Sequence, residues 1–352
     1  MRVYLLFLLS VCWLPALTQT NVVKMNAVKS NNYGVTYFLP KTVLVIEAEF
    51  SKIQKKAGPY AKYAEKYLGV SDAVIDDQIH YSLDKINVIS KGIPNKEEGY
   101  LIEFKQKTTA PYVYLTKDGL LCTINAEYGE EDTFAGSVSK KKSSEVSALN
   151  PESALSEEYF RAGSVTKQAE VVAKQIYRIR ESRTDILTGE LENAPRDGEA
   201  MKIILEQLET QEKALTEMFT GITTVEKQYA EFELMPETDI DKEIIFRFSK
   251  YLGVVEPDDL SGSPVYLNLK KQETPPPPET NSKKDKKGLV YNLPGKASVA
   301  IFYGKTNLFE GNVQVTQFGI TQTLATSIFE DKKAPIRIYF YPETGAIKQI
   351  IQ

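Results

Sequence analysis

A pentapeptide that occurs twice constrains the architecture of this chain more than any other feature. Lys-Tyr-Leu-Gly-Val occupies residues 66–70 and again residues 250–254. Each copy ends a short helical pattern with glycine at the stop position and then enters an extended segment. A second echo relates residues 37–46 to residues 291–302, because both contain Tyr-x-Leu-Pro, then a lysine and a strand pattern. The order of the two echoes differs between the halves, so we expect related building blocks and not a clean tandem duplication.

A charged segment with helical periodicity lies between the two copies. Gly189 and residues 193–198 divide it into two parts, and Asp197 is placed to cap the second. The apolar residues that recur at three- and four-residue steps are Val165, Ala169, Val172, Ile176, Ile179 and Ile186, then Met201, Ile204, Leu208, Leu215 and Met218. Burying each is worth roughly 1.5–3 kcal/mol, against about 0.2–0.5 kcal/mol for an exposed charge pair. The apolar stripes therefore predict two helices that pack on each other or on the rest of the protein.

The remainder of the chain carries short strand patterns and turn signals, which predict an α+β fold. Asp118-Gly119 is typical of a hairpin turn, and residues 336–351 read as a closing hairpin around residues 342–345. We expect two β-rich lobes that share short sequence motifs, with an inserted α-helical hairpin. The expected boundaries are a signal peptide at 1–20, an N-terminal β-rich lobe with a short helix at 21–135, a linker at 136–156, the helical hairpin at 157–222, and a C-terminal β-rich lobe at 223–352 that contains a Pro/Lys-rich loop at 273–288.

The first twenty residues predict export from the cytoplasm. Arg2 gives the positive start, a short apolar run follows, and small residues near Thr18 end it. We therefore expect a periplasmic or cell-surface protein, with no transmembrane segment after signal removal. Cys12 raises the alternative of lipid attachment, but Val11 precedes it where a small residue is expected. Signal removal would leave Cys122 as the one cysteine, so no internal disulfide is expected.

Composition argues against nucleic acid as a partner, because the net charge is −4 and the pI is about 5.5. Phosphate-cradling glycine motifs are missing from the sequence, so we expect no nucleotide cofactor, and indeed no cofactor of any kind. His80 is the single histidine, which excludes a metal centre built on two imidazoles within one chain. A Ser-His-Asp triad or a Cys122–His80 dyad would have to use it, yet His80 reads as an ordinary strand residue and Cys122 lies in an apolar strand.

Carboxylates leave two further alternatives open. Asp239, Asp241 and Glu243 alternate in a way that offers oxygens to calcium, but a turn leading into a strand explains them as well. A glycosidase needs only two carboxylates. The sequence predicts no catalytic, cofactor-binding or metal-binding residue. Tyr60, Tyr63 and Tyr67 fall on one helical face and form the candidate interaction surface, although such stripes are usually core.

The chain resembles an exported family of gut Gram-negative bacteria that is catalogued as a domain of unknown function, number 4831. The residues that carry the resemblance are the Tyr-x-Leu-Pro-Lys run within 34–45, the block at 58–70, Thr-Lys-x-Gly-Leu-Leu at 116–121, and the helical stretch from Ile176 to about residue 190. The resemblance covers nearly the whole chain after the signal. It implies export and this architecture, and it brings no catalytic or binding residues.

The sequence thus favours a non-enzymatic exported cell-envelope protein that binds a protein or glycan partner. The alternative is a carboxylate-based hydrolase that acts on an envelope polymer. An enzyme predicts a deep pocket with two converging carboxylates, whereas a binding module predicts a broad apolar patch or groove. A third hypothesis is a structural component that assembles through the helical insert.

Overall fold

The computed structural model describes residues 21–24, 34–103, 112–128, 155–190, 198–276, 288–325 and 336–352. Several predictions from the sequence lie outside these residues. They are the signal peptide with Cys12, nearly all of the linker at 136–156, the helix cap at Asp197, and most of the Pro/Lys-rich loop at 273–288.

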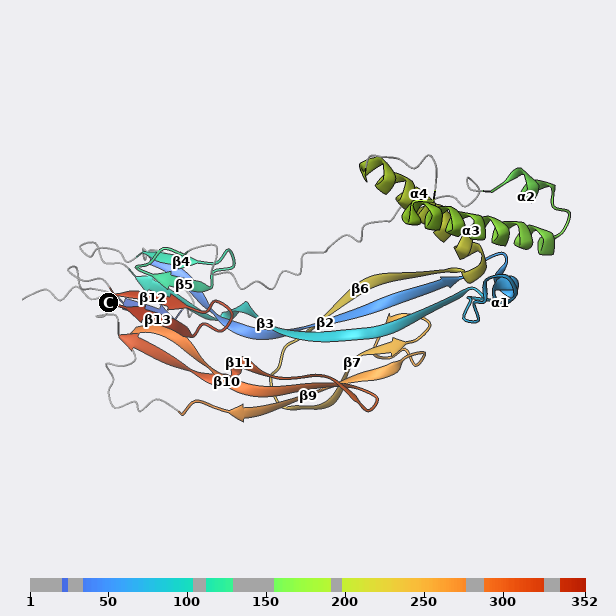
Figure 1. Ribbon diagram of the computed structural model, residues 1–352. Coiled ribbons are helices and arrows are strands. Elements are labelled where there is room, and N and C mark those ends of the chain that lie inside the picture. The colour runs from blue at the N-terminus through green and yellow to red at the C-terminus, as the bar shows by residue number, and fades with distance from the viewer. Residues whose placement is uncertain are drawn as a thin grey trace, which may run out of the picture.

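Two antiparallel sheets stacked face to face form the long body of the molecule (Figure 1). The first sheet has the order β1-β3-β2-β6. Its strands are β1 (Asn21–Lys24), β2 (Gly34–Lys56), β3 (Gln78–Glu103) and β6 (Ile222–Leu234). The second sheet has the order β11-β10-β9-β7-β8. Its strands are β7 (Ile240–Ser249), β8 (Gly253–Val255), β9 (Ser263–Glu273), β10 (Gly288–Tyr303) and β11 (Thr306–Ala325).

The main core lies between these two sheets. Alternate residues of β2, including Leu44, Ile46 and Phe50, point inward and meet Phe246 and Leu267 from the second sheet. Phe232 on β6 stacks on Phe246 with ring centroids 4.6 Å apart. The period of two in the strand sequence therefore decides which face of each sheet is buried.

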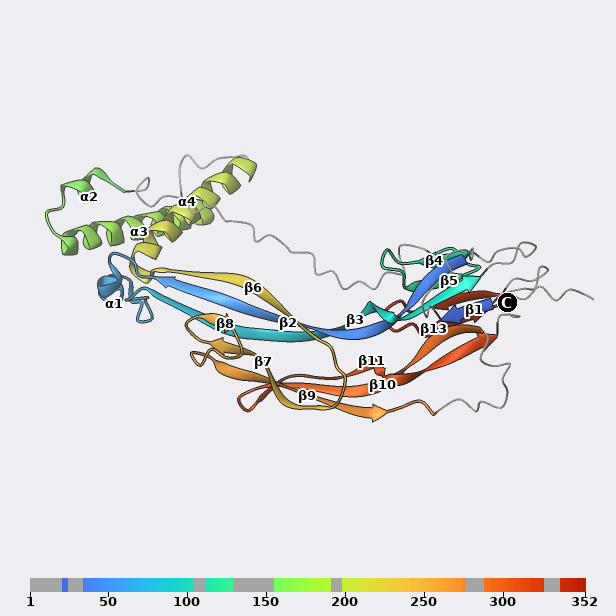
Figure 2. The same ribbon diagram turned by 180° about the vertical axis from the view of Figure 1, so that it is seen from behind.

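A third, small sheet closes one end of the sandwich, at the C-terminal end of the chain (Figures 1 and 2). Its order is β13-β12-β5-β4. Its strands are β4 (Val113–Leu115), β5 (Leu121–Ile124), β12 (Arg337–Phe340) and β13 (Ile347–Ile351). The predicted turn at Asp118-Gly119 joins β4 to β5, and the predicted closing hairpin is formed by β12 and β13. Both predictions are confirmed.

The helices gather at the opposite end (Figures 1 and 2). A 3-10 turn (Ala61–Tyr63) leads into α1 (Ala64–Leu68), and α2 (Glu157–Arg161), α3 (Val165–Thr188) and α4 (Gly198–Thr220) follow along the chain. Gly69 and Gly189 end α1 and α3 in the left-handed conformation, with φ of 67° and 77°. The helices α3 and α4 share a buried cluster that includes Ile176 and Leu215. None of the described helices is both long and apolar enough to cross a membrane.

The two predicted lobes are not separate bodies. The strand β6 comes from the predicted C-terminal lobe, yet it pairs with β2 along residues 44–56 in the first sheet. In the small sheet β12 pairs with β5, which again joins the two halves. Backbone hydrogen bonds between sequence-distant strands therefore merge the expected lobes, which short-range sequence patterns do not reveal.

Strand lengths also correct the sequence prediction. The sequence carries only short strand patterns, but residues 42–48, 79–83 and 99–103 are parts of two long strands, β2 and β3, that run past their prolines. Pro40 lies directly opposite Pro94, next to a register shift. Since neither proline has an N–H to donate, placing them opposite each other at a bulge interrupts the ladder once instead of twice.

The two sequence echoes have different outcomes. The first copy of the pentapeptide ends α1 as predicted, but the second is the turn between β7 and β8, so the expected helix before it is wrong. The Tyr-x-Leu-Pro echo does mark equivalent structure. It lies in β2 and in β10, each an interior strand of its sheet, and both strands have a register shift at the proline.

Side chains lock the first half of the chain to the second near this echo. The hydroxyl of Tyr37 donates to the carbonyl of Val290 and accepts from its N–H, both at 3.0 Å. The Asn292 amide donates to the carbonyl oxygens of Pro40 and Thr344, at 3.1 and 3.0 Å. Pro40 lies in the part of β2 that precedes its pairing with β6 at Leu44. There, side chains of the other half of the chain bond backbone groups of β2 and β10 in place of a neighbouring strand.

We predict that Tyr37→Phe lowers the free energy of unfolding by about 1–3 kcal/mol, because it leaves the partly buried N–H and carbonyl of Val290 without their bond to the hydroxyl. Tyr37 has no exposed surface. The matched control is Tyr291→Phe, at the equivalent position of the echo. Its hydroxyl bonds the side chain of Gln322 at 2.8 Å, in a half-buried setting. Urea denaturation should show a smaller loss for Tyr291→Phe, and equal losses would contradict this account.

Candidate functional site

The outer face of the small sheet carries a row of paired residues across all four strands. Tyr114 lies opposite Thr123, Thr123 opposite Tyr339, and Tyr339 opposite Gln349. Directly paired residues point to the same side of a sheet. The other side of this sheet is buried in a core that contains Leu121, Ile124, Ile338 and Phe340. The row therefore belongs to the face that points away from the sandwich, but Thr123 within it is covered and has no exposed surface.

Two tyrosines at the edge of the small sheet extend this row into solvent. Tyr114 lies on the edge strand β4 and Tyr112 directly precedes that strand, and their rings stack with centroids 6.4 Å apart and planes inclined by 20°. Tyr112 is 73% exposed and Tyr114 38%. The pair forms an exposed stack of two aromatic rings that are held by the strand and by each other.

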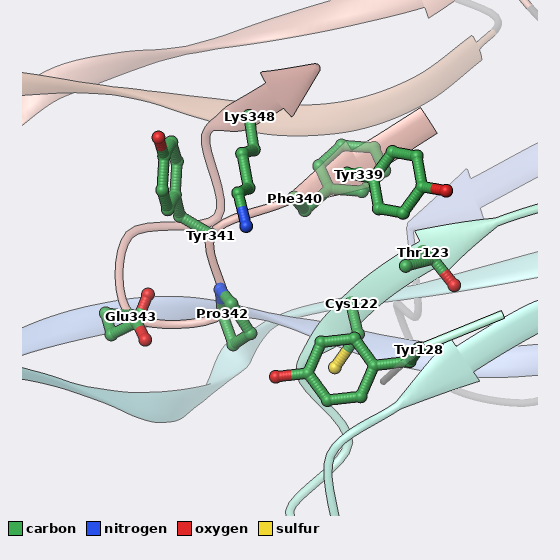
Figure 3. A pocket seen from close by; sticks show the side chains of 9 residues that line it. All are labelled: Cys122, Thr123, Tyr128, Tyr339, Phe340, Tyr341, Pro342, Glu343 and Lys348. Carbon is green, nitrogen blue, oxygen red and sulfur yellow. The ribbon is translucent and has the colours of Figure 1, made fainter. Parts of the chain in front are cut away.

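A pocket of about 160 Å³ opens beside the row (Figure 3). It lies between β5 and the hairpin formed by β12 and β13. The residues that line it are Cys122, Thr123, Tyr128, Tyr339, Phe340, Tyr341, Pro342, Glu343 and Lys348. Figure 3 shows the Lys348 ammonium reaching into the space between Tyr341 and Pro342. We call the outer face of the small sheet, with Tyr112, Tyr114 and this pocket, the tyrosine face.

Charge in the pocket is mixed. Glu343 supplies a carboxylate from the β12–β13 turn, and Lys348 supplies an ammonium group 6.0 Å from the centre of the Tyr341 ring. Asn292 on β10 holds this turn in place. Its side-chain amide donates to the Thr344 carbonyl, and its backbone N–H donates to the Gly345 carbonyl at 3.1 Å. A fixed backbone holds the two charges and the aromatic walls in a preformed arrangement.

Cys122 forms part of the pocket wall but is not poised as a nucleophile. The side chain is 1% exposed, and its Sγ lies 3.7 Å from the Leu120 carbonyl oxygen. Burial, and secondarily the negative charge of Glu343, raises the pKa of the Cys122 thiol to about 11. The thiol is therefore protonated at neutral pH and behaves as a small apolar group.

The candidate surface from the sequence, Tyr60, Tyr63 and Tyr67, lies at the helical end and faces inward. Tyr60 is 2% exposed, and its hydroxyl is 2.7 Å from that of Tyr159. Tyr63 bonds Thr166 at 2.9 Å, and the backbone carbonyl of Tyr67 accepts from the Tyr177 hydroxyl at 2.8 Å. The three tyrosines connect α1 and the turn before it to α2 and α3. They therefore act as packing residues, which is the usual role of such a stripe.

The remaining sequence candidates do not converge. His80 pairs with Ile53, whereas Leu120, two residues before Cys122, bridges to Phe38. At about 3.3 Å per residue, the 15 residues of β2 between these points separate the Cys122–His80 pair by roughly 50 Å. Asp239 accepts from the Lys271 N–H at 2.8 Å, as a residue leading into a strand does. Among the described residues, no group of three His, Cys, Asp or Glu could hold a metal ion.

Sequence reasoning missed the tyrosine face, although a signal for it exists. Tyr-x-Tyr occurs at 112–114 and again at 339–341. Two tyrosines at this spacing share one face of a strand. The missing information is that β5 and β12 are neighbours, which brings the two patterns onto one face.

We predict that Cys122 in the folded protein reacts with iodoacetamide at pH 8 at least about 100-fold more slowly than in urea, because about one thiol in a thousand is ionised. Mass mapping of the Cys122 peptide gives the rate. Glu343→Gln should raise it only a few-fold, since burial is the larger cause of the raised pKa. Equal rates in the folded and unfolded chains would contradict the assignment.

The same raised pKa predicts a loss of stability at alkaline pH. The folded-state pKa of Cys122, about 11, lies above the ordinary value of 9.0, so folding favours the protonated thiol. This contribution is fully present below pH 9 and is lost as the pH rises through 11. Cys122→Ala should remove the part of the alkaline destabilisation that this thiol causes, which urea denaturation between pH 8 and 11 would measure.

Comparison with known proteins identifies the family. The family model described as Domain of unknown function (DUF4831) matches residues 33–348, so the chain belongs to this family. A search of the curated proteins found no match, and neither did a search of the solved structures.

Proposed function

We propose that this DUF4831 protein is an exported cell-envelope protein that binds a protein or glycan partner through the tyrosine face, without catalysing a reaction. The observation that carries the proposal is the exposed, stacked pair Tyr112 and Tyr114 beside a preformed pocket. Exposed aromatic rings that are already fixed lose little conformational freedom when a partner covers them, which makes them effective contact residues.

Export rests on the predicted signal peptide at residues 1–20, and a periplasmic or surface location follows from it. The alternative of a carboxylate-based hydrolase requires two acids on one substrate. Glu343 is the one carboxylate among the residues that line the pocket. The pocket therefore favours binding over hydrolysis.

The proposed surface differs from the one suggested by the sequence. Tyr60 and Tyr63 of the helical face are engaged within the protein, whereas Tyr112 and Tyr114 beside the small sheet are exposed. The helical insert, in this proposal, stabilises the far end of the sandwich, and the small sheet meets the partner.

We predict that Tyr112→Ala/Tyr114→Ala lowers the affinity for isolated envelope material at least about tenfold, because it removes both exposed rings of the stacked pair. The control is Tyr251→Ala. Tyr251 has the same exposed fraction, 73%, but lies in the β7–β8 turn, outside the tyrosine face. Cosedimentation of the purified protein with envelope material measures the affinity. An equal loss in both variants, or no loss in either, would overturn the proposed site.

A further inference from the structure

We propose that two copies of this chain pair along the open edge of β4, antiparallel about a twofold axis at Tyr114, so that their four-stranded small sheets join into one continuous sheet. This inference goes beyond the proposed function, since it concerns contact between two copies and not the envelope partner. It is carried by the direction of the backbone groups of β4, the uncharged residues along its edge, and the exposure of Tyr112 and Tyr114.

Two hydrogen bonds fix the direction in which the backbone groups of β4 point. The Tyr112 carbonyl accepts at 2.7 Å from the N–H of the residue just after β5, and the Thr116 N–H donates at 2.8 Å to the carbonyl of the residue just before β5. Because this direction alternates along a strand, the N–H and C=O groups of Val113 and Leu115 point to the opposite edge. Among the described residues, no strand pairs with that edge, which lies on the side of the small sheet away from β10 (Figures 1 and 2).

One register pairs all of these groups. With the twofold axis at Tyr114, Val113 of each copy lies opposite Leu115 of the other copy. Each such pair exchanges two N–H···O=C bonds, as hydrogen-bonded pairs of antiparallel strands do, so every open group of both edges has a partner. A twofold axis at Val113 or at Leu115 instead places the other residue opposite a position beyond β4. Only the axis at Tyr114 therefore pairs β4 along its whole length.

The side chains fit the same register. On the outer face Tyr114 lies opposite Tyr114 of the second copy, and Tyr112 lies opposite Thr116. On the inner face Val113 lies opposite Leu115, and both side chains are partly buried against the core of the small sheet. Aromatic and aliphatic pairs of this kind stabilise neighbouring strands.

Charge does not oppose this pairing. A twofold axis brings residues near the axis close to their own copies, where any charge would repel itself. Residues 112–116 carry no charge. The edge strand β6, by contrast, carries Glu226, Lys227, Glu231 and Glu233, and charged side chains discourage the pairing of an edge with another strand. A second copy therefore meets no like-charge repulsion along the β4 edge.

The exposed area sets the strength of the contact. Tyr112 is 73% exposed and Tyr114 38%. Since a whole tyrosine covers about 150–250 Å², these two side chains offer roughly 200 Å² per copy, well below the roughly 800 Å² per partner of a stable complex. The dimer is therefore weak and reversible, and it forms where the protein is concentrated.

Pairing directs both tyrosine faces the same way. Directly paired residues point to the same side of a sheet, so the outer faces of the two copies lie on one side of the joined sheet. A dimer therefore presents two pockets to one surface. A partner with repeated sites is then bound by both copies at once, with a higher apparent affinity than one copy gives.

The first test traps the pair as a disulfide. Tyr114 meets its copy as a non-hydrogen-bonded pair, in which the Cα atoms are about 4.5 Å apart and within disulfide range. Tyr114→Cys, made together with Cys122→Ala, should therefore give a covalent dimer on mild oxidation. Tyr112→Cys in the same background is the matched control. Its two copies lie roughly 14 Å apart, so it should link at least about tenfold more slowly. Equal rates would overturn the register.

The second test removes an edge donor. Val113→Pro deletes an N–H that points away from β5, so the pairing of β4 with β5 is kept and circular dichroism should show a folded chain. Sedimentation equilibrium between about 10 µM and 1 mM should show association of the unmodified protein and a monomer for Val113→Pro. An unmodified protein that stays monomeric throughout would overturn the proposal, and so would association that Val113→Pro leaves unchanged.

The dimer and the proposed function fail separately. Val113→Pro keeps both tyrosine rings, so it should still cosediment with envelope material. A protein that cosediments but never associates with itself overturns the dimer and leaves the proposed function standing. One that associates but does not cosediment does the reverse. Cosedimentation that Val113→Pro abolishes in a monomeric protein would assign the β4 edge to an extended peptide of another protein and overturn the dimer.

Discussion

The structure depends on the hydrogen bonds that β2 makes in its first part, before its pairing with β6 begins at Leu44. Among the described residues, the edge of β2 that β6 does not reach is held by side chains of the C-terminal half and by one isolated bridge from Phe38 to Leu120. Gln317 accepts from the Thr42 N–H at 3.0 Å and donates to its carbonyl at 2.8 Å, while Asn292 bonds the carbonyl of Pro40. These contacts fix the two large sheets against each other, because unmet backbone groups in a core cost about 1–3 kcal/mol each.

The same contacts position the small sheet. Asn292 bonds Thr344 as well as Pro40, so one amide holds β2, β10 and the β12–β13 turn together. At the equivalent position of the echo, the Phe38 N–H donates to the Gly119 carbonyl in the β4–β5 turn at 2.9 Å. Each half of the chain thus anchors its own short hairpin, and the two hairpins pair through β5 and β12. Our proposal for the tyrosine face relies on this joint, because each hairpin contributes a part of the face.

Tyrosine has opposite roles at the two ends of the molecule. Tyr60 is buried against Phe219, with ring centroids 5.5 Å apart, and burial raises the pKa of its hydroxyl. Tyr112 stacks on Tyr114 in solvent. The side chain is the same in both places, and what differs is whether another element covers the ring. At the helical end α2, α3 and α4 supply that cover for Tyr60.

The sequence by itself determined the local elements: the two packed helices from their apolar stripes, the glycine stops at Gly69 and Gly189, and the hairpin turns at Asp118-Gly119 and residues 342–345. These features follow from interactions between residues close in the chain. Tertiary structure alone decided that β6 joins β2, that Pro40 faces Pro94, and that β5 lies beside β12. Strand pairing joins segments far apart in sequence through backbone hydrogen bonds, which every residue type but proline can make, so residue identity carries little information about the partner. The tyrosine face is built on such a pairing, and it could not be read from the sequence for that reason.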